Sequence, residues 1–282
     1  MKLQTERKKR SFASFARQGY LLKTYMVILF YALRKTRFTR KDLSGLAFLI
    51  VAPLMYFSRM RTVKSPIGLL SLEDQELFRS IVYGFFKTHF CYLKYMASAN
   101  AGSHFSAIVD IGANIGDFAM ATSRMADHVM AIEPGKRNFI NLKENLELNG
   151  MDNILPLNIA ATDSCKTLRM EGNTSDLFVS SEGNGEDVVG LPLDKVCGDL
   201  SLGRIDVLKL DVQGHELSAL AGMYRLLREH APKLVMVEVH LKRGVKAADV
   251  ARVMRSHGYR LLSKTNFLFD QPHMCFMSAS RA

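Results

Sequence analysis

Residues 109–118 read Val-Asp-Ile-Gly-Ala-Asn-Ile-Gly-Asp-Phe and continue a short apolar run that starts at Ala107. The apolar run predicts a β-strand, the two glycines predict a tight turn, and a helical pattern follows them. Glycine permits positive φ and a close approach of a ligand. The N–H groups at a helix start attract anionic groups. The stretch therefore predicts a strand–turn–helix unit that binds a ligand, with Asp110 at the strand end.

The spacing of the glycines discriminates between cofactors. A dinucleotide-binding turn has the pattern G-x-G-x-x-G, whereas Asn114 stands here in place of the middle glycine. The pattern D-x-G-x-N-x-G resembles the first motif of class I S-adenosylmethionine methyltransferases. That resemblance implies S-adenosyl-L-methionine as the cofactor, bound through Asp110, Gly112, Asn114 and Gly116. The alternative is a glycine turn that binds no ligand, since glycine turns are common in doubly wound domains.

A second predicted strand, at 128–133, ends in Glu133. A ribose-binding acid is expected roughly 20 residues beyond the turn, so Glu133 is a candidate cofactor ligand. Its alternative role is to stabilise a helix N-terminus, and Pro134 fits the first position of that helix. A third strand at 154–158 leads to a turn that we expect beside an adenine ring, with Asp163 as a cofactor contact, or else to a polar turn.

The rest of the chain continues the alternation of strands and helices. Further strands are predicted at 205–211, 233–240, 259–262 and 274–278, with helices at 215–229 and 247–257. Residues 171–187 are rich in Gly, Asn, Ser and Glu and predict a mobile loop. Strands that alternate with helices predict an α/β fold, a mostly parallel doubly wound sheet with helices on both faces.

Two later motifs narrow the family. Residues 206–216 read Asp-Val-Leu-Lys-Leu-Asp-Val-Gln-Gly-His-Glu, and residues 237–240 read Val-Glu-Val-His. Together with the glycine turn and Glu133-Pro134, they resemble the FkbM family of methyltransferases over residues 104–279. The resemblance implies a seven-stranded class I methyltransferase (Rossmann-like) sheet and O-methylation of a sugar or natural-product hydroxyl. His215 departs from the aromatic residue often present there in the family.

The reaction itself suggests the catalytic candidates. Methyl transfer needs donor and acceptor to be aligned, and a hydroxyl acceptor needs a general base. Asp211, His215, Glu238 and His240 lie near the carboxyl ends of the fourth and fifth strands, and we expect His215 or Asp211 to be the base. A histidine at a helix start is also common on protein surfaces.

Lys209 is a further candidate because it lies inside an apolar strand. A buried amine requires a partner, and Glu238, Asp211 or Glu216 is the expected one. Such a network is either structural or holds the acceptor hydroxyl.

Other chemistries receive little support from the sequence. Asp211, Glu238 and His240 have ligand types suited to a divalent cation, but their spacing shows no dedicated cage, so we predict no metal. The sequence contains no C-x-x-C, H-E-x-x-H, P-loop or G-x-S-x-G motif. It also lacks the Asp/Asn-Pro-Pro-aromatic tetrapeptide that marks amino methylation. Four widely spaced cysteines predict reduced thiols and a cytoplasmic location.

The charge is concentrated at the start of the chain. Residues 1–64 hold 15 Lys and Arg against 2 acidic residues, whereas the remainder holds 23 against 25. The predicted methyltransferase domain, 106–282, therefore has no electrostatic reason to bind nucleic acid. The apolar runs at 24–33 and 43–58 are short against the roughly 20 residues of a membrane span.

For residues 1–64 we accordingly predict a helical extension, joined to the domain by linking helices at 65–105. Amphipathic helices on an anionic membrane surface are one interpretation, which would make the protein peripheral on the cytoplasmic face. A helical cap over the acceptor pocket is the other.

The sequence leads to one preferred function and two alternatives. The preferred function is O-methylation of a hydroxyl on a glycan, a lipid-linked sugar or a small metabolite. The alternatives are an RNA methyltransferase with a basic N-terminal arm, which steep salt dependence of binding would favour, and a non-catalytic scaffold.

Overall fold

The computed structural model describes residues 62–65, 67–71, 87–88, 92–99, 104–172, 176–180, 185–200, 203–266 and 272–280. The chain divides between Arg59 and Met60, and every described residue belongs to the second unit. The prediction of a helical extension for residues 1–64 lies outside these residues except at 62–64. Among the described helices, none is long and apolar enough to cross a membrane.

The region expected to contain linking helices begins with a β-hairpin instead. Strands β1 (Thr62–Ser65) and β2 (Gly68–Ser71) pair antiparallel. The Ser65 hydroxyl donates to the Gly68 carbonyl at 2.9 Å, and Gly68 has a φ of +140°. This turn chemistry favours a hairpin over a helix. A short helix, α4 (Leu93–Ala99), follows before the main sheet.

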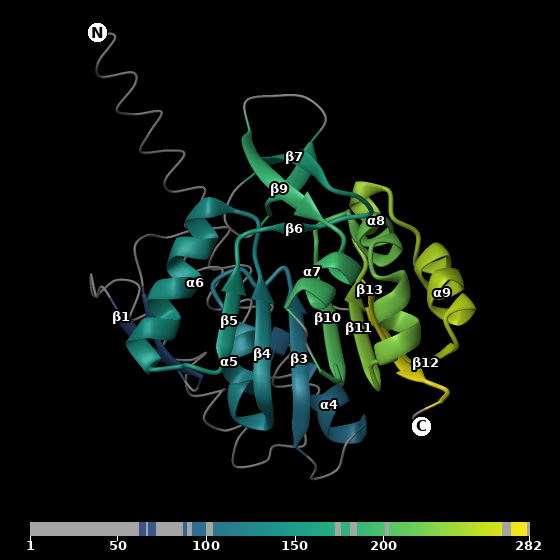
Figure 1. Ribbon diagram of the computed structural model, residues 1–282, viewed down its shortest axis with the longest axis horizontal. Coiled ribbons are helices and arrows are strands. Elements are labelled where there is room, and N and C mark those ends of the chain that lie inside the picture. Colours follow the sequence, from purple (N-terminus) through teal and green to yellow (C-terminus); the bar gives the residue numbers. More distant parts are fainter. Residues whose placement is uncertain are drawn as a thin grey trace, which may run out of the picture. The chain divides into compact units, whose positions relative to one another are not determined.

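The main sheet confirms the doubly wound fold. Its seven strands run in the order β12-β13-β11-β10-β3-β4-β5, as Figure 1 shows. The bounds are β3 Phe105–Ile111, β4 Ala126–Ile132, β5 Ile154–Leu157, β10 Val207–Leu210, β11 Leu234–Glu238, β12 Tyr259–Asn266 and β13 Pro272–Ser278. Strands β5, β4, β3, β10 and β11 are mutually parallel, whereas β13 is antiparallel to both of its neighbours.

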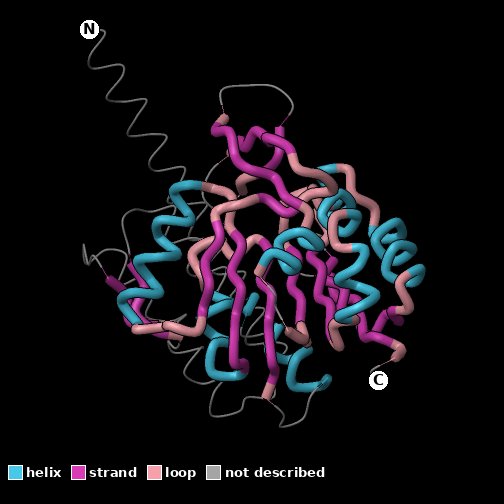
Figure 2. Tube along the Cα trace, viewed as in Figure 1, coloured by secondary structure: helices cyan, strands magenta, loops and turns pink. Residues whose placement is uncertain are grey.

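Side-chain alternation along the strands separates the two faces of this sheet. Leu208 and Leu210 join the large apolar cluster that lies beneath α7 (Leu193–Asp199), α8 (Glu216–Ala221), η3 (Leu226–His230) and α9 (Ala247–Ser256). Lys209, between the two leucines, points to the opposite face. There Phe118 of α5 (Asp117–Thr122) packs edge-on against Tyr92, with ring centroids 5.5 Å apart. Figure 2 shows helices flanking the strands.

Two predicted helices differ in their limits from the observed ones. Helix α6 (Lys136–Asn149) starts after Gly135, so Pro134 is not its first residue, and it ends at Gly150, which has a φ of +57°. The Gly135 N–H donates to the Glu133 carboxylate, which keeps the entry to the helix extended. The helix predicted at 215–229 is interrupted after α8, at Gly222, where a Cβ would lie 1.9 Å from the Thr162 carbonyl oxygen, so only glycine fits.

A second, smaller sheet extends into the region predicted as a mobile loop. Strands β6 (Ala160–Ala161), β9 (Glu186–Leu191), β7 (Lys166–Glu171) and β8 (Phe178–Ser180) pair in that order. The loop prediction for 171–187 is therefore wrong at β8 and at the start of β9. The sheet has its own apolar cluster of Ala160, Leu168, Met170 and Val188. In Figure 1 it lies at the top of the view, beyond the ends of the central strands.

Candidate active site

A cavity opens at the carboxyl ends of the central strands. Its empty space, including open solvent at the mouth, is about 880 Å³. One part of the lining comes from the loops after β3 and β4 and from the small sheet. The lining includes Gly112, Asn114, Ile132, Glu133, Asn138, Ala160, Ala161, Met170, Leu177, Val179, Lys87, Tyr92, Lys209, Asp211, Gln213 and His215. Ligands of doubly wound folds bind at this edge.

The glycine turn has the geometry that the sequence predicts. Gly112 has a φ of +77°, and a Cβ there would lie 1.8 Å from the Asp211 carbonyl oxygen. Asn114 also has a positive φ, +51°, which is uncommon for a residue with a side chain. The Gly112 and Ala113 N–H groups both donate to the Ile132 carbonyl at 2.9 Å. Glycine is thus required for the close approach of the loops after β3 and β10.

Glu133 lies at the end of β4, buried and facing this turn. Its carboxylate accepts hydrogen bonds from the Asn114 N–H at 2.8 Å, the Gly135 N–H at 3.0 Å and the Asn138 side-chain amide at 3.1 Å. Burial nevertheless raises the pKa of Glu133 to about 7. The buried Asn114 Oδ1 has no hydrogen-bond partner within the described part of the chain. An acceptor carboxylate and an unused amide oxygen beside a cavity suit a ligand that carries hydroxyl or amino donors.

Lys209 has a different partner from those predicted. Its Nζ donates to Asp110 Oδ1 at 2.8 Å and to the Gly112 carbonyl at 3.0 Å. Strand β10 pairs in parallel with β3, and the register places Lys209 opposite Asp110. Although burial disfavours the ammonium, the carboxylates of Asp110, Asp211 and Asp117 raise the pKa of Lys209. The predictions of Glu238, Asp211 or Glu216 as its bonded partner are therefore wrong.

Lys87 is the residue that the sequence analysis missed. Its Nζ lies 2.7 Å from Asp211 Oδ2 and 2.8 Å from Glu238 Oε2. The Tyr92 hydroxyl lies 3.4 Å from the same Glu238 oxygen. Burial opposes ionisation of Asp211, but the ammonium groups of Lys87 and Lys209 hold its pKa below the ordinary value. An ion-paired carboxylate of low pKa is a weak proton acceptor, so Asp211 is a poor candidate for the general base.

His240 and Glu238 lie behind this ion pair and do not line the cavity. His240 Nε2 lies 3.6 Å from Asp211 Oδ1 and 3.8 Å from Glu238 Oε1, so the side chains at the ends of the fourth and fifth predicted strands do meet. His240 Nδ1 is 2.5 Å from Glu216 Oε1. Burial works against protonation, but the hydrogen bond to Glu216 and the nearby carboxylates raise the pKa of His240.

His215 does line the cavity, at the start of α8. Its Nε2 lies 2.9 Å from the Thr162 hydroxyl, which fixes the orientation of the ring. Burial, and then the charge of Lys166, lower the pKa of His215. The imidazole is therefore neutral near pH 7 and able to accept a proton.

The other predicted cofactor contacts, Asp110, Gly116 and Asp163, are not among the residues that line the cavity. Asp110 holds Lys209, and Gly116 precedes α5 with a φ of +94°. Asp163 is a correction: its carboxylate is exposed and pairs with Lys166 at 2.6 Å, outside the cavity lining. A charged side chain in an exposed turn can rotate toward a nearby opposite charge, here Lys166. The position of Asp163 in the sequence therefore could not show whether its carboxylate enters the cavity. Ala160 and Ala161, just before it, do line the cavity.

Comparison with known proteins adds to this geometry. The family described as the methyltransferase FkbM domain matches residues 110–261. The hexuronic acid methyltransferase AglP of Haloferax volcanii is 30% identical over 149 residues, which cover 51% of this chain and 59% of that protein. The AMB antimetabolite synthetase AmbE of Pseudomonas aeruginosa is 34% identical over 82 residues, 28% of this chain and 4% of that protein. The chain thus spans less than two thirds of each relative.

Among solved structures, the magnesium protoporphyrin IX methyltransferase ChlM of Synechocystis PCC 6803 is similar with a TM-score of 0.47 and 11% identity. The similarity covers 87% of this chain and 100% of that chain.

Proposed function

The chain belongs to the FkbM methyltransferase family, and we propose that it is an S-adenosylmethionine-dependent O-methyltransferase acting on a hydroxyl of a glycan, a lipid-linked sugar or a small metabolite. One observation carries this proposal. The cavity is lined by the glycine turn and Glu133 and also by a neutral histidine, His215. The turn and Glu133 suit a nucleoside-type cofactor, and His215 suits deprotonation of an acceptor.

The residues on the cofactor side fit S-adenosylmethionine. Glu133 is placed to accept hydrogen bonds from ribose hydroxyls, and the backbone around Gly112 and Asn114 allows close approach of the ligand. Ala160 and Ala161 present small apolar side chains to the cavity, which suits a flat base. When bound, S-adenosylmethionine supplies an electrophilic methyl group on a sulfonium. What this chain contributes is alignment of the two reactants and exclusion of water.

The acceptor side is polar without being strongly charged. Lys87 is paired with Asp211 and Glu238, and Lys209 is paired with Asp110. Gln213 and His215 therefore provide the hydrogen-bonding groups that face an incoming hydroxyl. We assign His215 as the general base, because its ring is neutral near pH 7 and lines the cavity.

A saccharide is the acceptor class that one relative, AglP, favours. AglP is named for methylation of a hexuronic acid, and a sugar offers the hydroxyls that the polar side of this cavity can bind. The preference for a hydroxyl over a carboxylate follows from the charges, since Lys87 and Lys209 are already engaged by acidic side chains.

The test is to incubate the full-length chain with methyl-labelled S-adenosylmethionine and separated lipid-linked, glycan, RNA and small-molecule fractions of a cell extract. We expect label in a saccharide-containing fraction, retained after mild alkali because a methyl ether resists hydrolysis. Release of the label by mild alkali would indicate a methyl ester and contradict the hydroxyl assignment. Label in RNA would overturn the acceptor class altogether.

Variants separate the two sides of the site. His215→Asn should lower the rate of methyl transfer by about 10²–10⁴-fold, the usual contribution of a general base, while leaving cofactor affinity nearly unchanged. Glu133→Ala should weaken cofactor binding instead. Unchanged cofactor affinity in Glu133→Ala would reject the ribose assignment.

A further inference from the structure

We propose that Asp211, Glu238 and His240 form a binding site for a divalent transition metal ion, such as Mn²⁺ or Zn²⁺, in the wall behind the cavity. From the spacing in sequence we predicted no metal cage. In the structure, however, one ligand atom from each of the three side chains lies within 4.8 Å of the other two. This proposal goes beyond methyl transfer and does not depend on it.

The strongest observation is that two buried atoms face this point without a hydrogen bond. His240 Nε2 and Glu238 Oε1 belong to side chains that are each 1% exposed, and neither atom has a hydrogen-bond partner among the residues that the structure describes. Their separation, 3.8 Å, is too long for a hydrogen bond. The same is true of the 3.6 Å between His240 Nε2 and Asp211 Oδ1. Buried polar atoms are rarely left in this condition.

The distances are close to those of a coordinated cation. Metal–ligand bonds of about 2.0–2.2 Å place neighbouring ligand atoms about 3–3.5 Å apart. The observed separations from His240 Nε2 exceed this by a few tenths of an ångström. Side-chain rotations that shorten these separations, and the separation of at most 4.8 Å between the two carboxylates, bring the three atoms into a coordination sphere.

The hydrogen bond of His240 to Glu216 supports the same role. Glu216 Oε1 accepts the Gly214 N–H at 3.0 Å, so it acts as an acceptor and His240 Nδ1 carries the proton. This arrangement aims the lone pair of Nε2 at Asp211 and Glu238. A carboxylate that holds the far nitrogen of a ligating histidine is the usual support of a metal site.

The donor set indicates the kind of metal. One imidazole nitrogen with two carboxylates suits Mn²⁺ or Zn²⁺ better than the all-oxygen environment preferred by Mg²⁺. Lys87 occupies the other carboxylate oxygens, Asp211 Oδ2 and Glu238 Oε2. Its ammonium opposes a second cation, so metal affinity depends on whether Lys87 is present.

Because Lys87 opposes the metal ion, Glu216→Gln and Lys87→Gln should change the metal affinity in opposite directions. Titration of the metal-free full-length chain with Mn²⁺, followed by electron paramagnetic resonance and calorimetry, should show one bound ion per chain. His240→Gln should weaken binding at least 10-fold and remove the nitrogen coupling from the spectrum. Glu216→Gln should weaken it about 10–100-fold, whereas Lys87→Gln should strengthen it.

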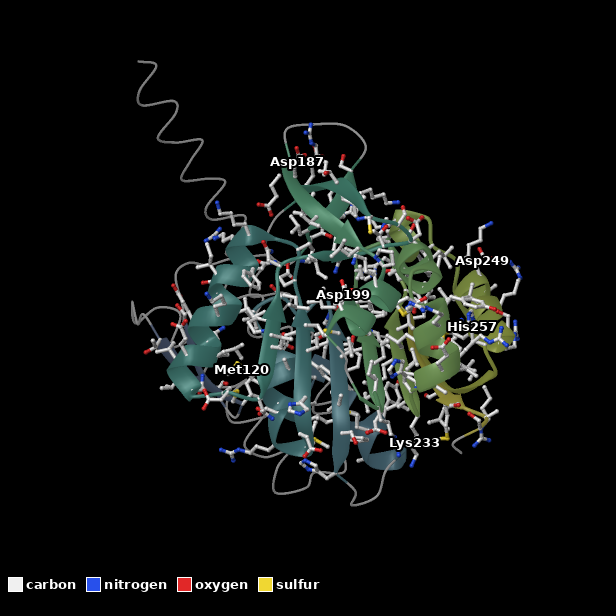
Figure 3. The ribbon with its side chains drawn as sticks, viewed as in Figure 1. Met120, Asp187, Asp199, Lys233, Asp249 and His257 are labelled. Atoms are coloured by element: carbon white, nitrogen blue, oxygen red, sulfur yellow. The ribbon has the colours of Figure 1, made fainter. Side chains whose placement is uncertain are left out.

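Two matched substitutions serve as controls, Asp187→Asn and His257→Gln. Figure 3 shows Asp187 at the top of the small sheet and His257 beside α9, both away from the central strands. Neither should alter the affinity. Circular dichroism tests whether each variant is folded. If His240→Gln is unfolded, the opposite changes in metal affinity of Glu216→Gln and Lys87→Gln decide whether the site exists. Absence of stoichiometric Mn²⁺ and Zn²⁺ binding by the wild type overturns the proposal, as does binding that these variants leave unchanged.

Discussion

Replacing Glu133 with Gln should change how the stability of the protein depends on pH. Burial raises the pKa of Glu133 from 4.5 to about 7 in the folded state. Between these values the unfolded chain has released the proton while the folded chain retains it, so the free energy of unfolding falls as pH rises. The difference of about 2.5 pH units, at about 1.4 kcal/mol each, corresponds to at most about 3.5 kcal/mol. This contribution is present below about pH 4.5 and is lost above about pH 7.

Urea unfolding followed by far-UV circular dichroism at several pH values provides the measurement. Because Gln does not titrate, the free energy of unfolding of the wild type minus that of Glu133→Gln should fall by about 3 kcal/mol as pH rises from 4.5 to 8. Asp187→Asn changes a side chain that is 57% exposed. Its free energy of unfolding, plotted against pH, should run parallel to that of the wild type. Parallel curves for Glu133→Gln as well would refute the claim that burial controls this carboxylate. Added S-adenosylmethionine should flatten the difference, since hydroxyl donors stabilise the ionised form.

Three further outcomes are expected. Gly112→Ala should lower the free energy of unfolding by about 2–5 kcal/mol, because the left-handed backbone is strained and the new Cβ overpacks the turn. Gly150→Ala, at a φ of +57° with nothing within 4 Å, should lower it by only about 1–2 kcal/mol. Chemical denaturation measures both changes. Lys209→Met should cost about 3–5 kcal/mol by leaving the Asp110 carboxylate buried and unpaired, and adding Asp110→Asn should restore more than half of that loss in a double-mutant cycle. The pKa of His215 is lowered from its ordinary 6.5, so the single-turnover rate of methyl transfer should be flat above about pH 6.5 and fall only at lower pH; a decline that begins near pH 8 would exclude His215 as the base.

The order of strands and helices was predictable because the residue pattern of each element lies in one continuous stretch of sequence. Strands buried on both faces appear as nearly continuous apolar runs, and β3, β4, β10 and β11 all have this character. The cofactor turn was predictable for a similar reason, since Gly112, Asn114 and Gly116 lie within one short segment. Local geometry there depends on residue type more than on distant contacts.

The contacts across the site were less accessible from the sequence. Lys87 meets Asp211 and Glu238 from 124 and 151 residues away, and no motif marks it. The partner of Lys209 depends on the register of β10 against β3, which places it opposite Asp110. Register is set by packing of the whole sheet rather than by the strand itself. The strands of the small sheet were missed because they are short and are separated by polar, glycine-containing turns.

The small sheet has an evolutionary consequence. Its side chains Met170 and Val179 form part of the cavity wall, yet its apolar cluster is separate from the core beneath α7, α8 and α9. Substitutions there can reshape the wall at little expense to the stability of the central sheet. A change of acceptor can therefore arise from substitutions in β7 and β8, within residues 166–180, while Ala160, Ala161 and the loops after β3 and β4 retain the site of the methyl donor.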